Sequence, residues 1–168
     1  LILKFDASGG YERLISQGTA LMDSAAAQFA DKRIDQPLIK QMLPTMHIYL
    51  TSGRNNPMAN ILRTKNIDFK ELLVDVNTSA ETGVKGQAFL YSLNYDSTKI
   101  DTIKLHLTQK GERLTYQGQV CNNRRNPQFV FNALFDGTVH EHGALVGVRY
   151  YDSKGRMGIR LGATAQME

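Results

Sequence analysis

The sequence predicts an α+β fold, mainly antiparallel β, with its helices gathered in the N-terminal third. Over residues 100–167, apolar and polar side chains alternate with a period of two, which is typical of strands with one buried face. Short polar turns separate these segments, so neighbouring strands are expected to run antiparallel. Before Thr64, apolar residues instead recur at helical spacing.

The N-terminal part, residues 1–65, is predicted to be mixed. Residues 1–6 alternate as a strand, and residues 11–31 carry apolar side chains at helical spacing around an Ala-rich centre. Pro37 suits the first position of a short second helix, which must end near Pro44. We expect the helix over residues 11–31 to cover some of the apolar sheet face.

A strand over residues 46–51 and a third helix are predicted next. The helix spans residues 57–64, because Asn56 is a good N-cap and Pro57 suits the first helical position. Residues 66–77 look extended, and their apolar face changes parity near Glu71, which indicates a β-bulge.

The remaining strands form a predicted meander. They cover residues 84–95, 100–109, 114–120, 129–139, 144–150 and 157–167, with the last four turns near Gly111, Arg125, His142 and Lys154. Several run to about 10–12 residues, against a usual mode of about 5–6. One face is apolar and the other carries Lys104, His106, Gln117, Gln119, Arg149, Arg160, Thr164 and Gln166.

The composition excludes some structural and functional classes of protein. The 168 residues suit a single domain, and 20 basic against 16 acidic residues leave a formal charge of +4. No run of four Lys or Arg occurs, so the charge pattern argues against a nucleic-acid partner. The single Cys121 excludes an intrachain disulfide, and no apolar run approaches about 18 residues. The first residues resemble the middle of a strand, so we expect an internal fragment of a larger protein.

Catalytic signatures are absent. The sequence has no nucleophile elbow, P-loop, dinucleotide-binding glycine motif, H-E-x-x-H or C-x-x-C, so no catalytic residue and no cofactor is predicted. Cys121 is better explained as a half-exposed strand residue than as a nucleophile. His140 and His142 would share one face of a strand, but without a third ligand they favour a solvated turn over a metal site.

Two further groups have a structural and a functional interpretation. Asp96 and Asp101 flank a turn, where capping is a better explanation than a carboxylate pair for glycoside hydrolysis. Arg124 and Arg125 are explained by a polar hairpin loop, with an anion or lipid headgroup as the alternative.

The apolar face poses the main functional question. The predicted helix over residues 11–31 is about 30 Å long but only one helix wide. Either the sheet curls onto itself to make an ordinary core, or part of the face remains as an apolar trough. An exposed apolar surface of that size marks a ligand or partner site.

Five segments resemble one known family. Residues 122–137, 147–152 and 158–163, together with 67–69 and 75–79, resemble the TamB family of translocation and assembly module proteins, in its Bacteroidetes-type branch. The resemblance covers most of the chain and is best from Ile67 onward.

This resemblance implies an elongated sheet curled into a trough (a β-taco), polar outside and apolar inside, as in AsmA-like proteins. It implies a periplasmic cell-envelope protein, anchored in the inner membrane. The family is linked to phospholipid transport to the outer membrane and to outer-membrane protein assembly with a BamA-type outer-membrane barrel partner. The helical segment before Pro44 departs from a pure β trough.

The resulting hypothesis is a scaffold that binds phospholipid or another amphipathic ligand without catalysis. The residues predicted to contact lipid are Leu105, Leu107, Leu114, Tyr116, Val120, Phe129, Phe131, Phe135, Val146, Val148, Ile159 and Leu161. One alternative is a non-catalytic interaction module, such as an adhesin or chaperone-like β domain. The other is a carbohydrate-active enzyme, which the absence of Trp disfavours.

Overall fold

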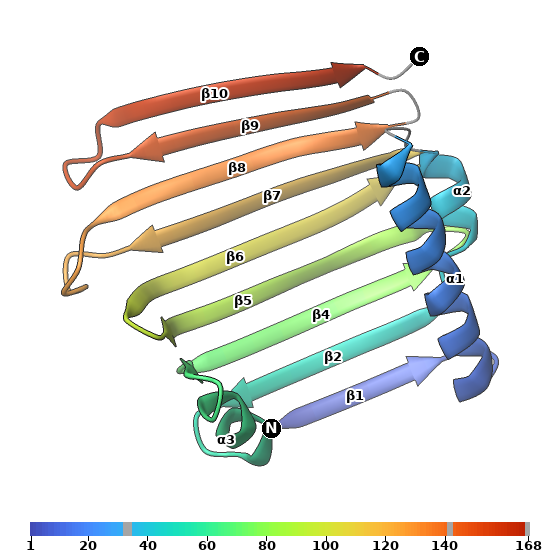
Figure 1. Cartoon of the computed structure of the whole chain (residues 1–168), viewed down its shortest axis with the longest axis horizontal. Helices are drawn as coiled ribbons and strands as arrows, with labels where there is room; N and C mark the ends of the chain where they lie inside the picture. Colours follow the sequence, from blue (N-terminus) through green and yellow to red (C-terminus); the bar gives the residue numbers. More distant parts are fainter. Residues whose placement is uncertain (32–34, 141–142, 167–168) are drawn as a thin grey trace.

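One antiparallel sheet dominates the computed structural model, which describes residues 1–31, 35–140 and 143–166. Nine strands follow one another across the sheet in chain order (Figure 1). They are β1 (Ile2–Ala7), β2 (Met46–Gly53), β4 (Glu71–Ser79), β5 (Gly83–Tyr95), β6 (Thr98–Lys110), β7 (Arg113–Asn122), β8 (Phe131–His140), β9 (Gly143–Tyr151) and β10 (Met157–Gln166). The short β3 (Ile67–Asp68) pairs with β5 outside this path. The predicted mainly antiparallel α+β class and the meander are confirmed.

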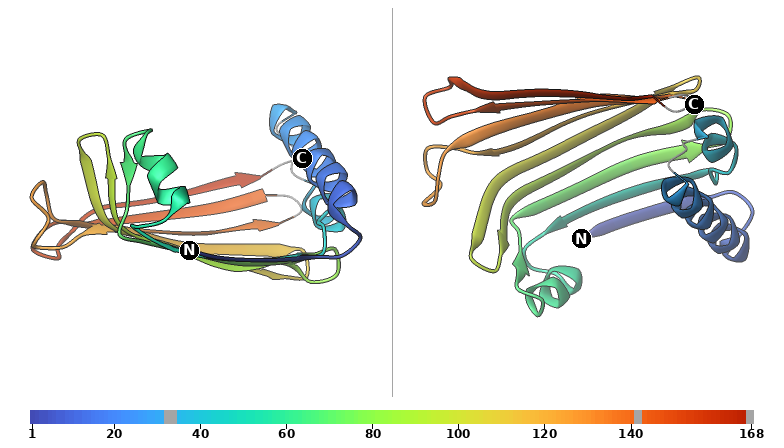
Figure 2. Two further views of the ribbon diagram at one scale, coloured as in Figure 1. Left: turned by 90° about the horizontal axis from the view of Figure 1, so that it is seen from below. Right: turned by 45° about the horizontal axis from the view of Figure 1, so that its top comes forward.

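The three helices lie on one side of the sheet, at its two ends. α1 (Tyr11–Ala30) and α2 (Gln36–Gln41) follow β1, and α3 (Pro57–Arg63) follows β2 at the opposite end (Figures 1 and 2). Figure 2 also shows that the sheet is bent, with β8–β10 inclined toward the side of the helices, and that β10 does not meet β1. The sheet is therefore open at both edges.

Local sequence signals explain the starts of the short helices. The Asp35 carboxylate accepts a hydrogen bond from the Leu38 N–H at 2.9 Å, with Pro37 in the first turn of α2. Asn56 does the same for α3, accepting from the Ala59 N–H at 3.1 Å. Both helices were predicted, α2 from Pro37 and α3 from Asn56 and Pro57, whereas the Asp35 cap was not anticipated.

Two boundaries differ from the sequence prediction. β8 begins at Phe131, so Phe129 and Val130 precede the strand. The irregularity near Glu71 is a break between β3 and β4, opposite Ser92, whose φ of 54° interrupts β5 pairing. The β8–β9 turn at His142 and the predicted strand end at Met167 lie outside the described residues.

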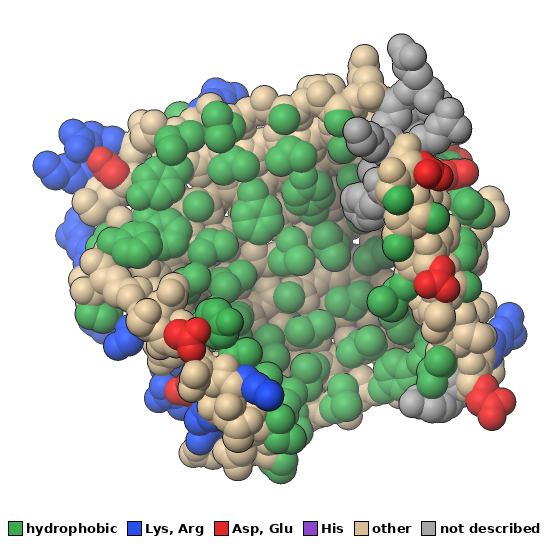
Figure 3. All heavy atoms as spheres, in the orientation of Figure 1, with side chains coloured by type: hydrophobic (Ala, Val, Ile, Leu, Met, Phe, Trp, Pro, Cys, Tyr) green, Lys and Arg blue, Asp and Glu red, His purple; other side chains and the backbone are tan. Residues whose placement is uncertain are grey.

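Among the residues that the structure describes, no second layer packs across the whole sheet. Within the described residues, the buried apolar side chains are Leu43, Ala59 and Phe69. α1 crosses one end of the apolar face and leaves most of it open (Figure 3), and Met22 on α1 remains 73% exposed. The expected cover by this helix is therefore limited to that end, and an ordinary closed core across the sheet does not form.

A small closed core forms instead beneath α3. Phe69 is 2% exposed and Ala59 of α3 is 1% exposed. Nearby, the Asn56 side-chain amide donates to Ser52 Oγ at 2.9 Å and to the Gly53 carbonyl at 2.6 Å. One side chain thus caps α3 and joins it to the end of β2.

Replacing Asn56 tests this junction. We expect Asn56→Ala to lower the free energy of unfolding by about 1–3 kcal/mol, because it removes an N-cap and leaves buried polar groups on β2 without a partner. Urea denaturation measures the change. Asn60→Ala, at an exposed position of the same helix, serves as the control, and equal effects of the two substitutions would contradict the assigned role of Asn56.

Candidate apolar binding face

The cross-strand register brings apolar side chains from all nine strands onto one face. Leu3, Leu50, Val74, Ala88, Leu105, Gly118, Phe135, Val148 and Leu161 occupy matched positions across the sheet. A neighbouring row is formed by Phe5, Ile48, Val76, Gly86, Leu107, Tyr116, Gly137, Val146 and Ala163. Because paired residues in adjacent strands point to the same side, these rows form a continuous apolar surface, which we call the apolar face.

The apolar face is large for an uncovered surface. Nine strands at a spacing of about 4.8 Å span about 38 Å, and the eight steps from Phe131 to Val139 add about 26 Å along the strands. The product is on the order of 1,000 Å², above the few hundred Å² common on monomers. Figure 3 shows this surface between α1 and α3. Leu3 and Leu161, near its two edges, are each 63% exposed.

Two aromatic rings lie over glycines at the centre of the apolar face. Gly118 of β7 pairs with Phe135 of β8, while Tyr116 of β7 pairs with Gly137 of β8. A Cβ at Gly118 would overlap the Phe135 ring, and one at Gly137 would overlap Tyr116 and the Leu145 carbonyl. Each ring therefore covers the glycine opposite it, an arrangement that fills the space a strand glycine leaves empty.

Eleven of the twelve predicted lipid-contacting residues lie on strands and share the apolar face. Seven of them belong to the two rows given above, and the other four follow by the same alternation. The exception is Phe129, which precedes β8 and is 57% exposed. Its ring stacks on Phe131 at 5.0 Å between centroids, and Phe131 stacks on Tyr150 at 6.1 Å, so Phe129 extends the face at one end.

The sequence prediction missed the contribution of the N-terminal half. Leu3, Phe5, Ile48 and Leu50 continue the apolar face across β1 and β2, and Val74 and Val76 do so on β4. Alternation in these strands was visible in the sequence. Which of their two faces joins that of β6–β10 depends on cross-strand register, which only the structure reveals.

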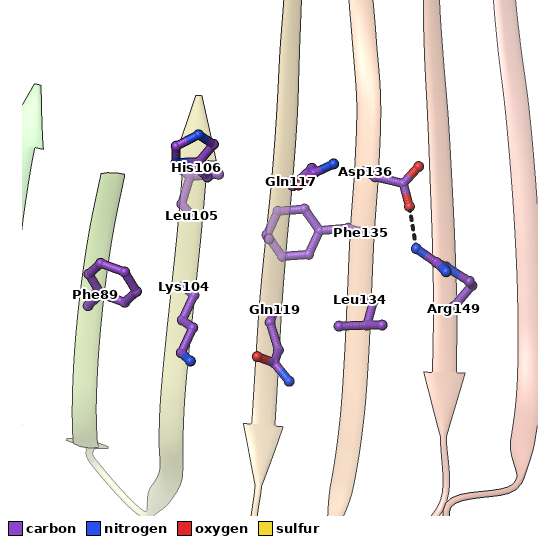
Figure 4. A pocket seen from close by; sticks show the side chains of 11 residues that line it. Phe89, Lys104, Leu105, His106, Gln117, Gln119, Leu134, Phe135, Asp136 and Arg149 are labelled. Carbon is purple, nitrogen blue, oxygen red and sulfur yellow. Dashed lines mark hydrogen bonds and ion pairs between the residues drawn. The ribbon is translucent and has the colours of Figure 1, made fainter. Parts of the chain in front are cut away.

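The opposite face is polar and carries a shallow depression of about 450 Å³ between β5 and β9 (Figure 4). Here Asp136 accepts a hydrogen bond from Arg149 Nη2 at 2.9 Å, and the Lys104 ammonium lies 5.9 Å from the centroid of the Phe89 ring. Both cations thus have partners within the sheet. All the predicted polar-face residues lie on this side.

The carboxylate considered for glycoside hydrolysis has a structural role. Asp101 accepts hydrogen bonds from the Asn123 N–H at 2.7 Å and from the Asn126 side chain at 3.1 Å. Asn126 also donates to the Lys99 carbonyl at 3.3 Å. These bonds fasten the β7–β8 loop to the start of β6, so Asp101 stabilises a loop other than the turn that it flanks. Arg124 and Arg125 of this loop are exposed.

The remaining candidate residues, Cys121 and His140, do not form a catalytic or metal site in the described part of the chain. Cys121 is half-buried on the polar face between Thr102 and Asn132. No cluster of three His, Cys, Asp or Glu side chains suited to a metal occurs in the described ranges. His140 pairs with Gly143 at the end of β8, and His142, its proposed metal partner, is outside those ranges.

The β9–β10 turn is organised by one carboxylate. Asp152 accepts from the N–H groups of Lys154 at 2.8 Å and Arg156 at 2.9 Å, and its other oxygen accepts from Arg156 Nε at 3.0 Å. The Arg156 N–H, aided by these other donors, holds the pKa of the Asp152 carboxyl below its ordinary value of 3.8. Arg156 is thereby paired, whereas Lys154 points to solvent.

The lowered pKa gives the turn a defined pH dependence. The ionised Asp152 carboxylate stabilises the turn fully when the pH is above 3.8. This stabilisation is lost as the pH falls through the lower folded-state pKa of Asp152. We expect the amide signals of Lys154 and Arg156 in NMR spectra to titrate with a midpoint below 3.8 and to lose that titration in Asp152→Asn. A midpoint at or above 3.8 would show that the carboxylate is not held as described.

Comparison with known proteins identified no relative of this chain. No protein-family model, no curated protein and no solved structure matches it. The helices of the described segments are all too short or too polar to cross a membrane.

Proposed function

We propose that this chain is a non-catalytic segment of a lipid-binding scaffold, which holds the acyl chains of phospholipids or similar amphiphiles on the apolar face. The observation that carries the proposal is the continuity of this face across nine strands, of which the described part of the chain covers only the end crossed by α1. Removing apolar surface from water is favourable by about 25 cal/mol per Å², so an acyl chain lying on the face is stabilised without any directional contact. A smooth apolar lining also lets the ligand move.

The larger assembly forms a second part of the proposal. The bend of the sheet toward its apolar side (Figure 2) fits one wall of a trough, polar outside and apolar inside. We infer that the chain belongs to a longer periplasmic protein of the cell envelope, anchored in the inner membrane. That protein would supply phospholipid to the outer membrane and act with a BamA-type barrel partner in outer-membrane assembly, as the TamB resemblance implies.

Lipid analysis of the purified protein tests the proposal. The chain is expressed in a bacterial envelope, purified in mild detergent, and extracted for mass spectrometry. We expect phospholipid in at least stoichiometric amount, and bound lipid should be displaced by a pyrene-labelled phospholipid. A folded protein that carries no lipid and takes up none of the probe would refute the proposal.

The two open edges favour one alternative function, a protein-interaction module. Every residue of β10 is exposed, and Arg160 is its single charged side chain. An unprotected strand of this kind can pair with a strand of another protein. Gly162→Lys and Thr164→Lys, on the polar side of β10, should block such pairing and leave lipid uptake intact. The alternative would be favoured if the purified protein carries no lipid and if these two substitutions abolish binding of a partner protein.

A further inference from the structure

The ends of the strands carry opposite charge. The segments at one end, residues 54–68, 96–97, 123–130 and 152–156, contain seven basic and three acidic residues. The described residues at the other end, 8–31, 35–45, 80–82 and 110–113, contain four basic and six acidic ones. Figure 3 shows basic side chains along the first end and acidic ones on α1 at the second. We call these the basic end and the acidic end.

Several cations at the basic end are free to bind an anion. Arg54 and Arg63 lie 3.0 and 3.5 Å from Asp68, and Arg156 lies 2.9 Å from Asp152. Lys65, Arg124, Arg125 and Lys154 form no ion pair within the described residues, and all four are exposed. Arg124, Arg125 and Lys154 come from the adjoining β7–β8 and β9–β10 loops (Figure 1).

The apolar face reaches this basic end through aromatic side chains. The stack of Phe129, Phe131 and Tyr150 adjoins the β7–β8 loop, which the Asn126 and Asp101 hydrogen bonds fasten in place. Tyr is amphipathic and suits a boundary between an apolar surface and a charged one. From Phe131 in this stack to Val139, the face runs about 26 Å along β8, longer than the roughly 15 Å of one leaflet of a bilayer core.

From this arrangement, and resting on the proposed function, we propose that the ligand is an individual phospholipid with a net negative headgroup. The headgroup phosphate lies at the basic end, against Arg124, Arg125 and Lys154. The acyl chains run along the strands toward the acidic end, where the carboxylates of α1 disfavour an anionic headgroup. Charge complementarity thus selects both the headgroup class and the orientation of the lipid.

Matched charge reversals test the headgroup selection. The variant carries Arg124→Glu, Arg125→Glu and Lys154→Glu. The control carries Lys85→Glu, Lys110→Glu and Arg113→Glu, which change the net charge equally at exposed positions near the acidic end. Affinities for pyrene-labelled phosphatidylglycerol and phosphatidylcholine are measured at low salt. We expect the first variant to bind phosphatidylglycerol at least about tenfold more weakly, and the control to change by less than about threefold.

The orientation has its own readout. Phosphatidylglycerol with a benzophenone at the end of one acyl chain is cross-linked by light, and the labelled peptides are identified by mass spectrometry. We expect labels at residues 113–116 and 137–140, near the acidic end. Labels concentrated at residues 120–122 and 131–133 would overturn the orientation.

The outcomes separate this inference from the proposed function. Equal binding of both phospholipids, unchanged by the reversals at the basic end, overturns the inference and leaves lipid binding in place. Failure of the folded protein to bind either lipid removes the proposed function and the inference together. Sedimentation with intact phosphatidylglycerol vesicles, without uptake of labelled lipid, overturns the inference in favour of docking on a bilayer surface.

Discussion

Phe135→Asp is expected to leave the protein folded and to abolish bound lipid. Phe135 sits at the centre of the apolar face, opposite Gly118. In a closed core an unpaired carboxylate would cost several kcal/mol and prevent folding. On an open face the carboxylate reaches water, so the main cost is lost packing, about 1–2 kcal/mol. Thermal melting measures the stability, and mass spectrometry of extracted lipid measures the binding.

The neighbouring residue provides the matched control. Leu134 belongs to the same strand but points to the polar face, where it pairs with Arg149. Leu134→Asp introduces the same charge one residue away, and it should retain wild-type lipid. Leu105→Asp, two strands from Phe135 in the same row, should repeat the loss. If Phe135→Asp and Leu105→Asp are both unfolded, the face is covered in solution. If both are folded and carry lipid, the acyl chains bind elsewhere.

Phe69→Ala should cause the largest loss of stability, about 3–5 kcal/mol, the range for a buried Phe. Phe69 is 2% exposed and belongs to the small closed core beneath α3. Because a domain of this size has a free energy of unfolding of about 5–15 kcal/mol, urea denaturation should reveal a much earlier transition. Lipid binding by the remaining folded protein should be unchanged.

Phe129→Ala is the control for this substitution. Phe129 is 57% exposed at the basic end of the apolar face, and its removal should cost less than about 1 kcal/mol. The contrast between the two phenylalanines follows from their surroundings, since the first would leave a cavity and the second would not. A Phe69→Ala variant as stable as Phe129→Ala would show that the core beneath α3 is not closed.

Local patterns accounted for most of the secondary structure. Alternation with a period of two predicted β6, β7, β9 and β10, and Pro37 and Asn56 predicted the starts of α2 and α3. These signals are readable because strand alternation and helix capping depend on residues a few positions apart. β8 was misjudged at its start: Phe129 continues the alternation, yet the loop that precedes the strand is held by hydrogen bonds to β6.

The make-up of the apolar face was only partly predictable. Eleven of its residues on β6–β10 were identified because each strand has a clear apolar side. The share of β1, β2 and β4 was missed, since a shift of one residue in register would move their side chains to the other face. The covering of Gly118 by Phe135 likewise depends on which residues of β7 and β8 lie opposite each other.

The sequence by itself determined the positions of the strands and helices and the alternation of apolar and polar side chains along each strand, because these follow from contacts between near neighbours in the chain. Only the tertiary structure decided that, among the described residues, α1 covers just one end of the apolar face and that the basic loops share one end of the sheet. Both depend on how the nine strands bend and pair. A strand with one apolar side satisfies its local pattern equally well in a closed core or on an open face, since burial is set by surfaces that are distant in sequence.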